Sequence, residues 1–199
     1  MNRKEFFGLL THLTARELKN VEIAYWLAKN GHRGQMRDSS EEPIRYFEHV
    51  RGVSLILITR GFNTAPLVIK SLLHDLTEDT LTPDGVVRRL FGKKVHDAIL
   101  HLSKVEPVFK PENGILDHWV EKPDHVYYSQ ISQAERDVRL VKCADRYHNL
   151  LGMQDVWKKK RQREYAEHTI QYLLPIAYLT EPSLALDIEH LVKRILNKK

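Results

Sequence analysis

The chain has 199 residues, 42% of them hydrophobic and 29% charged, which is the composition of a globular protein able to bury one core. Its single cysteine, Cys143, excludes an internal disulfide and fits a reducing cytoplasm, where we expect the protein to act. No apolar run reaches membrane-spanning length and the N-terminus lacks a signal-peptide pattern, so we expect no membrane partner. The formal net charge of +5 is compatible with nucleic acid, and equally with a pocket for a polyanionic small molecule.

Helical patterns follow one another along the first half of the chain. Thr14 and Glu17 form a capping-box pattern, and the apolar periodicity after them predicts a helix to about Gly31. A polar stretch from 32 to 43 predicts a loop. Further helices are predicted over 47–60, 65–80, 82–91 and 93–103, and prolines mark the starts of the second and third of these.

The second half begins with a segment, 106–124, that has three prolines and no clean period. This predicts an irregular loop, long enough to act as a functional lid. Helices are predicted over 127–131, 133–154, 158–178 and 182–196, and Pro175 should end or kink the third. Because no strand-like alternation, repeat or linker is present, we predict one all-α domain over residues 1–199, a bundle of roughly eight to ten helices.

Four ionisable side chains lie close together in the predicted helix 65–80: His74, Asp75, Glu78 and Asp79. Residues four apart share a helix face, so the first pair should lie above the second. The apolar run before them indicates a buried or half-buried helix, where such groups are costly without compensation. A divalent cation would compensate them, because imidazole and carboxylate suit a hard or borderline metal. The alternative is the ordinary acidic face of a surface helix.

Two residues on other predicted helices are candidate partners for this stretch. His49 lies near the start of one helix, and Asp145 lies in the middle of a long apolar one. A carboxylate in such a position needs a partner or a metal. The alternative for Asp145 is an ion pair with Lys142 or Arg146.

These residues stand in the order H…HD…D, which resembles the HD-domain metal-dependent phosphohydrolases. More narrowly, the segments H-R-G-Q-M-R, Y-F-E-H-V, L-L-H-D-L-T-E-D-T and L-V-K-C-A-D-R-Y-H-N-L resemble the hydrolase domain of the RelA/SpoT alarmone enzymes. The resemblance extends over nearly the whole chain, and the third and fourth segments together are a specific combination. The chain is similar to a stand-alone small alarmone hydrolase, as in the metazoan SpoT homologue.

The resemblance implies a site for one Mn²⁺, or a similar divalent ion, formed by His49, His74, Asp75 and Asp145. It implies two catalytic carboxylates, Glu78 and Asp79. It also implies substrate contacts from Arg33, Arg37, Asn149, Arg161 and Tyr165. The implied reaction is hydrolysis of guanosine 3′,5′-bispyrophosphate at the 3′ position, which releases pyrophosphate and leaves GDP or GTP. The expected partner is therefore a small nucleotide rather than a nucleic acid.

Two segments depart from the family pattern. Asp38 stands where the family has a lysine, and Leu150-Leu151-Gly152 stands where Met-Arg-Thr is usual. Both changes concern substrate contacts, and the metal and catalytic positions are intact. Two alternatives therefore remain open. One is a phosphohydrolase for another nucleotide, for example one that removes the 2′-phosphate of NADPH. The other is a catalytically silent HD module that senses a nucleotide.

The remaining candidate residues are interpreted as structural. His32 lies in the polar loop beside Arg33 and is assigned a structural role. His148 is expected to face away from Asp145, as a packing or surface residue. Cys143 is interpreted as a small buried residue of a helix core rather than a nucleophile.

Overall fold

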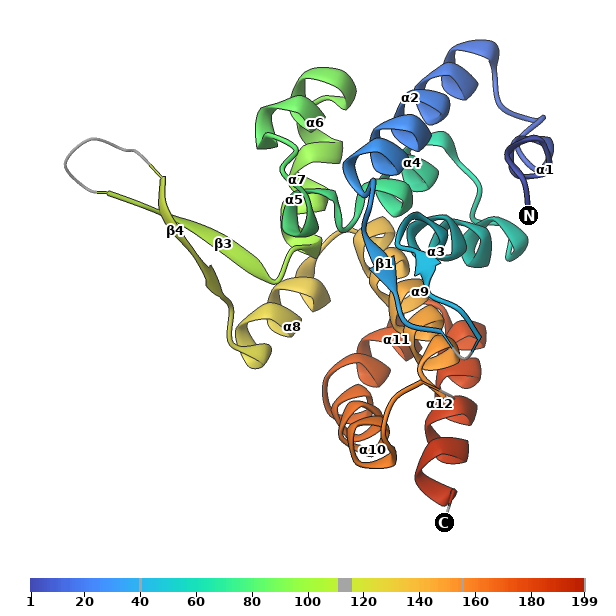
Figure 1. Cartoon of the computed structure of the whole chain (residues 1–199), viewed down its shortest axis with the longest axis vertical. Coiled ribbons are helices and arrows are strands. Elements are labelled where there is room, and N and C mark those ends of the chain that lie inside the picture. Colours follow the sequence, from blue (N-terminus) through green and yellow to red (C-terminus); the bar gives the residue numbers. More distant parts are fainter. Residues whose placement is uncertain (40, 111–115, 155, 199) are drawn as a thin grey trace.

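The computed structural model describes residues 1–39, 41–110, 116–154 and 156–198, which form a bundle of helices with two small antiparallel strand pairs (Figure 1). The helices are α1 Arg3–Gly8, α2 Ala15–Gly31, α3 Phe47–Thr59, α4 Ala65–Leu73, α5 Leu76–Asp79, α6 Asp84–Phe91, α7 Lys93–Leu102, α8 Asp124–Gln133, α9 Arg136–Gly152, α10 Lys159–His168, the π-helix Thr169–Leu173, α11 Leu174–Thr180 and α12 Pro182–Asn197. The strands are β1 Met36–Arg37, β2 Ile44–Arg45, β3 Val105–Phe109 and β4 Leu116–Glu121. The predicted all-α bundle is confirmed. Within the described ranges, none of the helices could span a bilayer, since none joins sufficient length to a sufficiently apolar composition.

Helix α9 lies at the centre of the bundle, packed against α3 and α4 on one side and α11 and α12 on the other (Figure 1). Its buried side chains recur with helical spacing, as at Val138, Val141, Ala144 and Leu150. Helix α4 is buried along almost its whole length. Each large apolar side chain removed from water in this way contributes about 1.5–3 kcal/mol. The buried polar residues of these helices, such as Ser71 and Asp145, are therefore surrounded by packed apolar side chains.

The first long helix begins at the predicted capping box. The hydroxyl of Thr14 accepts a hydrogen bond from the N–H of Glu17, and the Glu17 carboxylate accepts one from the N–H of Thr14 at 2.9 Å. At the other end, a Cβ on Gly31 would lie 2.6 Å from Cδ1 of Leu76. Glycine therefore allows α2 to end in direct contact with the turn that carries α5.

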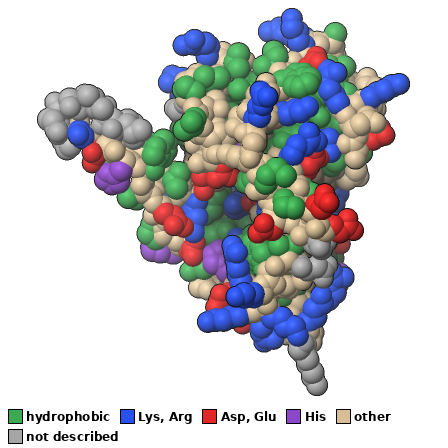
Figure 2. Space-filling view, in the orientation of Figure 1, with side chains coloured by type: hydrophobic (Ala, Val, Ile, Leu, Met, Phe, Trp, Pro, Cys, Tyr) green, Lys and Arg blue, Asp and Glu red, His purple; other side chains and the backbone are tan. Residues whose placement is uncertain are grey.

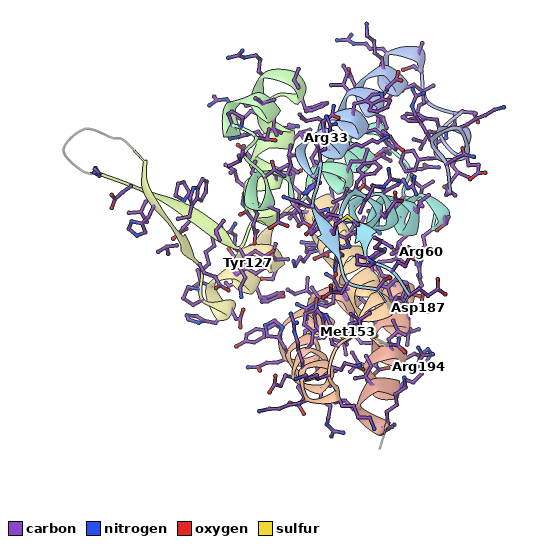
Figure 3. The ribbon with its side chains drawn as sticks, in the orientation of Figure 1. Arg33, Arg60, Tyr127, Met153, Asp187 and Arg194 are labelled. Carbon is purple, nitrogen blue, oxygen red and sulfur yellow. The ribbon has the colours of Figure 1, made fainter. Side chains whose placement is uncertain are left out.

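The chain after Lys158 forms α10, the π-helix and α11 in direct succession. Pro175 lies in the first turn of α11, immediately after the π-helix. A proline has no N–H to donate within a helix, and the wider π-turn before it accommodates that loss. The predicted interruption of the helix at Pro175 is therefore present as a π-turn. Farther along, Asp187 on α12 pairs with Arg60 at the end of α3, which ties the C-terminal helices to the centre (Figure 3).

The prediction of an irregular loop with one short element over 106–124 is wrong. Strands β3 and β4 pair antiparallel, with Val105 opposite Glu121 and Pro107 opposite Trp119, and they project from the body as an arm (Figure 1). A two-stranded arm without a buried face leaves no alternation of apolar and polar residues in the sequence. The tip, 111–115, lies outside the described residues, and the lid role of this segment stays a prediction.

Three other elements have boundaries that differ from the predicted ones. The predicted helix 65–80 is divided, because α4 ends at Leu73 and α5 begins at Leu76. Helix α8 is longer than the predicted 127–131. The long central helix begins only at Arg136, since Ala134 has extended backbone angles.

Candidate metal centre

The break between α4 and α5 lies at two of the candidate metal ligands. His74 keeps helical backbone angles, but Asp75 departs from them with φ −100° and ψ 1°. The continuous helix predicted for this stretch is therefore interrupted, and the two residues occupy a turn. The side chain of Asp75 lies within 4 Å of His49 on α3, and His74 lies within 4 Å of Asp145 on α9. The rings of His49 and His74 have centroids 5.3 Å apart.

Two nitrogens and two oxygens converge at this turn. Nε2 of His49 lies 3.3 Å from Oδ1 of Asp145 and 3.4 Å from Oδ2 of Asp75. Nε2 of His74 lies 3.2 Å from the same oxygen of Asp75 and 3.8 Å from that of Asp145. Neighbouring ligands of one ion, with bonds of about 2.1 Å, lie about 3 Å apart. The spacing therefore fits a single divalent cation, and we call these four residues the metal centre.

The metal centre is buried and attracts positive charge. Nε2 of His74 has no hydrogen-bond partner among the described residues. Burial by itself lowers the pKa of His74, but the carboxylates of Asp75 and Asp145 raise it to about 10. Burial opposes ionisation of both carboxylates. His74 and His49 nevertheless hold the pKa of Asp75 well below its usual range, and Lys142 with the two histidines does the same for Asp145. A divalent ion would supply the same positive charge to donor atoms that it prefers.

Both imidazoles are oriented by contacts through their other nitrogen. Nδ1 of His74 donates to the backbone oxygen of Ser71 at 2.8 Å, which leaves Nε2 free of its proton in the neutral form. Nδ1 of His49 lies 3.0 Å from Nδ1 of His148. Burial, with His49 and Arg37 nearby, lowers the pKa of His148 to about 3, so its neutral Nδ1 suits a hydrogen bond from the Nδ1–H of His49.

The prediction that His148 faces away from Asp145 is wrong. The two residues are three apart on α9, a spacing that places them on neighbouring parts of one helix face. This spacing was the signal that could have identified His148 as a partner of the metal centre. The imidazole also packs against α3, where a Cβ on Gly52 would lie 2.3 Å from Nε2 of His148. Only a glycine at position 52 leaves room for this imidazole.

Tyr46 connects Asp75 to the predicted catalytic residue Asp79. Its hydroxyl oxygen lies 2.7 Å from Oδ2 of Asp75 and 2.6 Å from Oδ2 of Asp79. The Gln35 side chain donates to the backbone oxygen of Asp79 and contacts Nδ1 of His32 at 2.7 Å. His32 stacks on Tyr46, with ring centroids 4.7 Å apart, which agrees with its structural interpretation. Tyr46 itself was not singled out from the sequence, although it precedes α3 directly.

Glu78, one residue before Asp79 in α5, has a different partner. Its Oε2 accepts a hydrogen bond of 2.8 Å from the N–H of Lys104, at the turn between α7 and β3. Burial raises the pKa of both Glu78 and Asp79, and the charge of Asp75 raises each further. Carboxylates with a raised pKa suit proton transfer near neutral pH. The two predicted catalytic carboxylates thus flank the metal centre.

A cavity of 460 Å³, which we call the α9–α10 cavity, opens beside Asp145. Its lining includes four cationic side chains, Lys104, Lys142, Arg146 and Arg161, and three acidic ones, Asp124, Asp145 and Glu164. Figure 2 shows a hollow in the middle of this face, bordered by acidic, basic and histidine side chains. The ion pair considered as an alternative for Asp145 is also present, since Nζ of Lys142 lies 2.9 Å from its Oδ2. Because the pair uses Oδ2, Oδ1 still faces the histidines.

The predicted substrate residues Arg161 and Tyr165 both line the α9–α10 cavity. The guanidinium of Arg161 lies 3.8 Å from the centroid of Trp157, and that of Arg146 lies 4.1 Å from the centroid of Tyr165. Arg146 is only 4% exposed and donates to the hydroxyl of Tyr128. Trp157 lies between α9 and α10, where no periodic pattern marks it, and sequence reasoning missed it.

Arg37 and Asn149 meet next to Asp145. Nη2 of Arg37 donates to Oδ1 of Asn149 at 2.6 Å, and Nδ2 of Asn149 donates to Oδ1 of Asp145 at 2.7 Å. Both line a further cavity of 300 Å³, the loop cavity, together with Asp38. Arg33 lines neither cavity and lies near the end of α2 (Figure 3). The structure thus groups the predicted substrate residues except Arg33.

The chain is similar to a known protein family and to several known proteins. Residues 24–178 match the family model of the HD domain. The chain is 30% identical over 171 residues to the bifunctional (p)ppGpp synthase/hydrolase SpoT of Escherichia coli. The aligned region covers 84% of this chain and 23% of that protein. The chain is also 30% identical over 163 residues to a probable chloroplastic GTP diphosphokinase of Arabidopsis thaliana, covering 81% of this chain and 22% of that one. The chain therefore spans less than a quarter of the length of these curated relatives.

A solved structure, described as a metazoan ortholog of SpoT that hydrolyzes ppGpp, superposes with a TM-score of 0.71 at 22% identity, covering 92% of this chain and 97% of that chain. At this identity the likeness concerns the fold. HD domains hold a divalent metal, and the residues that gather here are the two histidines and two aspartates of the H…HD…D pattern. Since the family model covers most of its length, the chain belongs to the HD domain family.

Proposed function

We propose that residues 1–199 form one hydrolase domain, which removes the 3′-pyrophosphate of guanosine 3′,5′-bispyrophosphate in a Mn²⁺-dependent reaction. The observation that carries this proposal is the convergence of two imidazoles and two carboxylates at the edge of a cavity whose lining includes two lysines and two arginines. The similarity to SpoT over most of the chain supports the choice of substrate. The buried thiol of Cys143 agrees with action in a reducing compartment such as the cytoplasm.

In this proposal His49, His74, Asp75 and Asp145 hold the ion. A divalent ion at this place would polarise a phosphoryl oxygen and lower the pKa of a water molecule. Glu78 and Asp79 lie at the periphery of that point, and their raised pKa values equip them to accept a proton from the attacking water. Since a water molecule attacks phosphorus directly, no covalent intermediate with the protein is needed.

Four of the predicted contacts hold the substrate in this proposal. Arg37 and Asn149 are hydrogen-bonded to each other at the loop cavity, and Arg161 and Tyr165 lie at the α9–α10 cavity. The two cavities share Asn149 and Arg161, so one extended nucleotide can use both. A guanidinium binds a pyrophosphate group through paired, charge-assisted hydrogen bonds. Arg33 is left out of this set because it lies elsewhere.

A second candidate substrate is NADPH, from which the enzyme would remove the 2′-phosphate. Asp38 lines the loop cavity close to where Arg37 binds, and its negative charge makes that end less favourable for a second pyrophosphate group. The metal chemistry would be the same, and only the held nucleotide would differ.

The test is a turnover assay with added Mn²⁺ that offers ppGpp and NADPH in parallel. Released pyrophosphate and phosphate are measured separately. Pyrophosphate from ppGpp is the expected result. Phosphate from NADPH alone would transfer the assignment to the second substrate. Neither product, from protein shown to bind Mn²⁺, would contradict both and favour a catalytically silent nucleotide sensor.

A further inference from the structure

A third cavity, of 370 Å³, lies between the C-terminal end of α2 and the start of α3, and we call it the α2 cavity. Its walls include Trp26, Lys29, His32, Arg33, Arg45 and Phe47. None of its lining residues belongs to the α9–α10 cavity or the loop cavity. Arg33 at its wall and Tyr127 in the α9–α10 cavity lie in different parts of the molecule (Figure 3). The α2 cavity is therefore a separate site.

The walls of the α2 cavity carry three cations and no carboxylate. Arg45 pairs with Glu48 outside the cavity, at 2.5 Å. Neither Lys29 nor Arg33 has an ion pair with any acidic side chain in the part of the chain that the structure describes. A concave surface lined by one sign of charge focuses its field and attracts ligands of the other sign.

A partly exposed aromatic ring accompanies these charges. Trp26 is 40% exposed although it is a large apolar residue, and Nζ of Lys29 lies 4.8 Å from its ring centroid. Indole faces bind planar ligands by stacking, and nucleic-acid bases stack on them whatever their identity. The cavity thus offers one surface for a ring and another for phosphate groups.

A buried polar atom without a partner belongs to the same wall. His32 is only 2% exposed, and its Nε2 makes no hydrogen bond to any described residue. Buried polar atoms are rarely left without a partner, and those that are call for a ligand or a water. This observation is independent of the surface charges and concerns a residue of the same wall.

We infer that the α2 cavity is a second ligand site, distinct from the metal centre, for a nucleoside polyphosphate whose base stacks on Trp26 and whose phosphates contact Lys29 and Arg33. The volume lies within the range of small-molecule sites, about 300–1,000 Å³. An arginine and a lysine suit this role, because one offers a planar fork to phosphate oxygens and the other a mobile point charge. The site needs no metal and stands whether or not the proposed reaction is correct.

The test uses GDP as the probe and Trp26 as the reporter. The chain has three tryptophans, so a full-length variant with Trp119→Phe and Trp157→Phe leaves only Trp26 to fluoresce. Saturable quenching by GDP is expected, with weaker binding of pyrophosphate alone and of guanosine alone. Quenching should persist in an added Asp145→Asn change, which impairs the metal centre. Absence of saturable quenching, or its loss with Asp145→Asn, would overturn the inference.

A matched pair of charge reversals decides where the probe binds. Lys29→Glu with Arg33→Glu should weaken GDP binding at least about tenfold, because two phosphate contacts become repulsive. Arg88→Glu with Arg89→Glu makes the same change of charge at exposed positions of α6 and should alter the affinity less than about twofold. Lys29→Ala with Arg33→Ala provides a milder version should the reversal disturb folding. Equal weakening by the α6 control would overturn the inference in favour of nonspecific attraction.

Discussion

The metal centre and the α2 cavity are both strongly charged, but their charges are balanced in opposite ways. At the metal centre, imidazoles and carboxylates from α3, α9 and the turn after α4 face one another within the protein. At the α2 cavity, Lys29 and Arg33 have no acidic partner among the described residues and lie partly or fully exposed. A preassembled cluster of small spacing suits a single ion, whereas uncompensated cations around an open hollow suit a larger anion. The following predictions test this difference, beginning with the strongest.

Removal of one ligand should abolish the metal centre. Asp145→Ala takes away one oxygen donor and leaves Lys142 without its partner. We expect loss of stoichiometric Mn²⁺ binding and a fall in kcat of at least about a thousandfold, because metal and water activation are lost together. Metal content and turnover on the same sample check this. Full turnover in the variant would show that the metal assignment is wrong.

Replacement of a flanking carboxylate should separate metal binding from rate. Glu78→Gln keeps the shape and the hydrogen bond from Lys104 but removes the proton acceptor. We expect unchanged Mn²⁺ affinity with kcat lower by about a hundredfold or more. Asp79→Asn is the companion variant on the other side. If kcat is unchanged for one of them, that residue has no catalytic role and the other remains the candidate base.

Crowding of His148 should weaken the metal centre indirectly. Gly52→Ala places a Cβ where the imidazole of His148 lies, so the contact that orients His49 is lost. Changes of this kind lower metal affinity by about tenfold to a hundredfold. Gly85→Ala on α6 is the control, because its Cβ would meet nothing within 4 Å. Equal Mn²⁺ affinity in the two variants would rule out an orienting role for His148.

Truncation of the two loop arginines should distinguish the two sites directly. Arg37→Ala removes the donor to Asn149, and we expect KM to rise about tenfold while Mn²⁺ affinity is retained. Arg33→Ala should leave KM within about twofold of the parent, since Arg33 lines the α2 cavity. If both variants raise KM equally, Arg33 belongs to the substrate site, as the family resemblance implies.

Metal binding should also release protons. In the metal-free protein the pKa of His74 is raised from 6.5 to about 10, so at pH 8 its imidazole carries a proton that an ion must displace. We expect release of about one proton per ion at pH 8 and none well above pH 10, where His74 is already neutral. Calorimetry in buffers of different ionisation enthalpy measures this number. No release at pH 8 would mean that His74 is neutral or is not a ligand.

The parts of the site that the sequence predicts well are those carried by buried helices. His49, His74, Asp75 and Asp145 stand out because charged groups in apolar helices need compensation, and the structure brings their ligand atoms together. The all-α fold follows from the same apolar periodicity.

The loops and the β3–β4 arm could not be predicted from the sequence in the same way. The separation of Arg33 from Arg37 depends on how the loop turns between α2 and β1, and no periodic pattern records a turn of this kind. The β3–β4 arm has no buried face to impose an alternation. The role of Tyr46 was hidden as well, because a tyrosine before a helix carries no signal until its neighbours in space are known.

The hydroxyl of Tyr46 contacts two carboxylates but has only one hydrogen to donate. Its oxygen approaches Asp75 and Asp79 equally closely, yet it has a single hydrogen to give. Two ionised carboxylates would leave one of these oxygen–oxygen contacts without a hydrogen between them. The short contact is satisfied when Asp79, the carboxyl with the raised pKa, supplies the missing hydrogen. An ion that draws electron density from Asp75 would weaken that oxygen as an acceptor and turn the tyrosine hydrogen toward Asp79. The hydroxyl of Tyr46 can therefore donate its hydrogen to only one of the two carboxylates at a time.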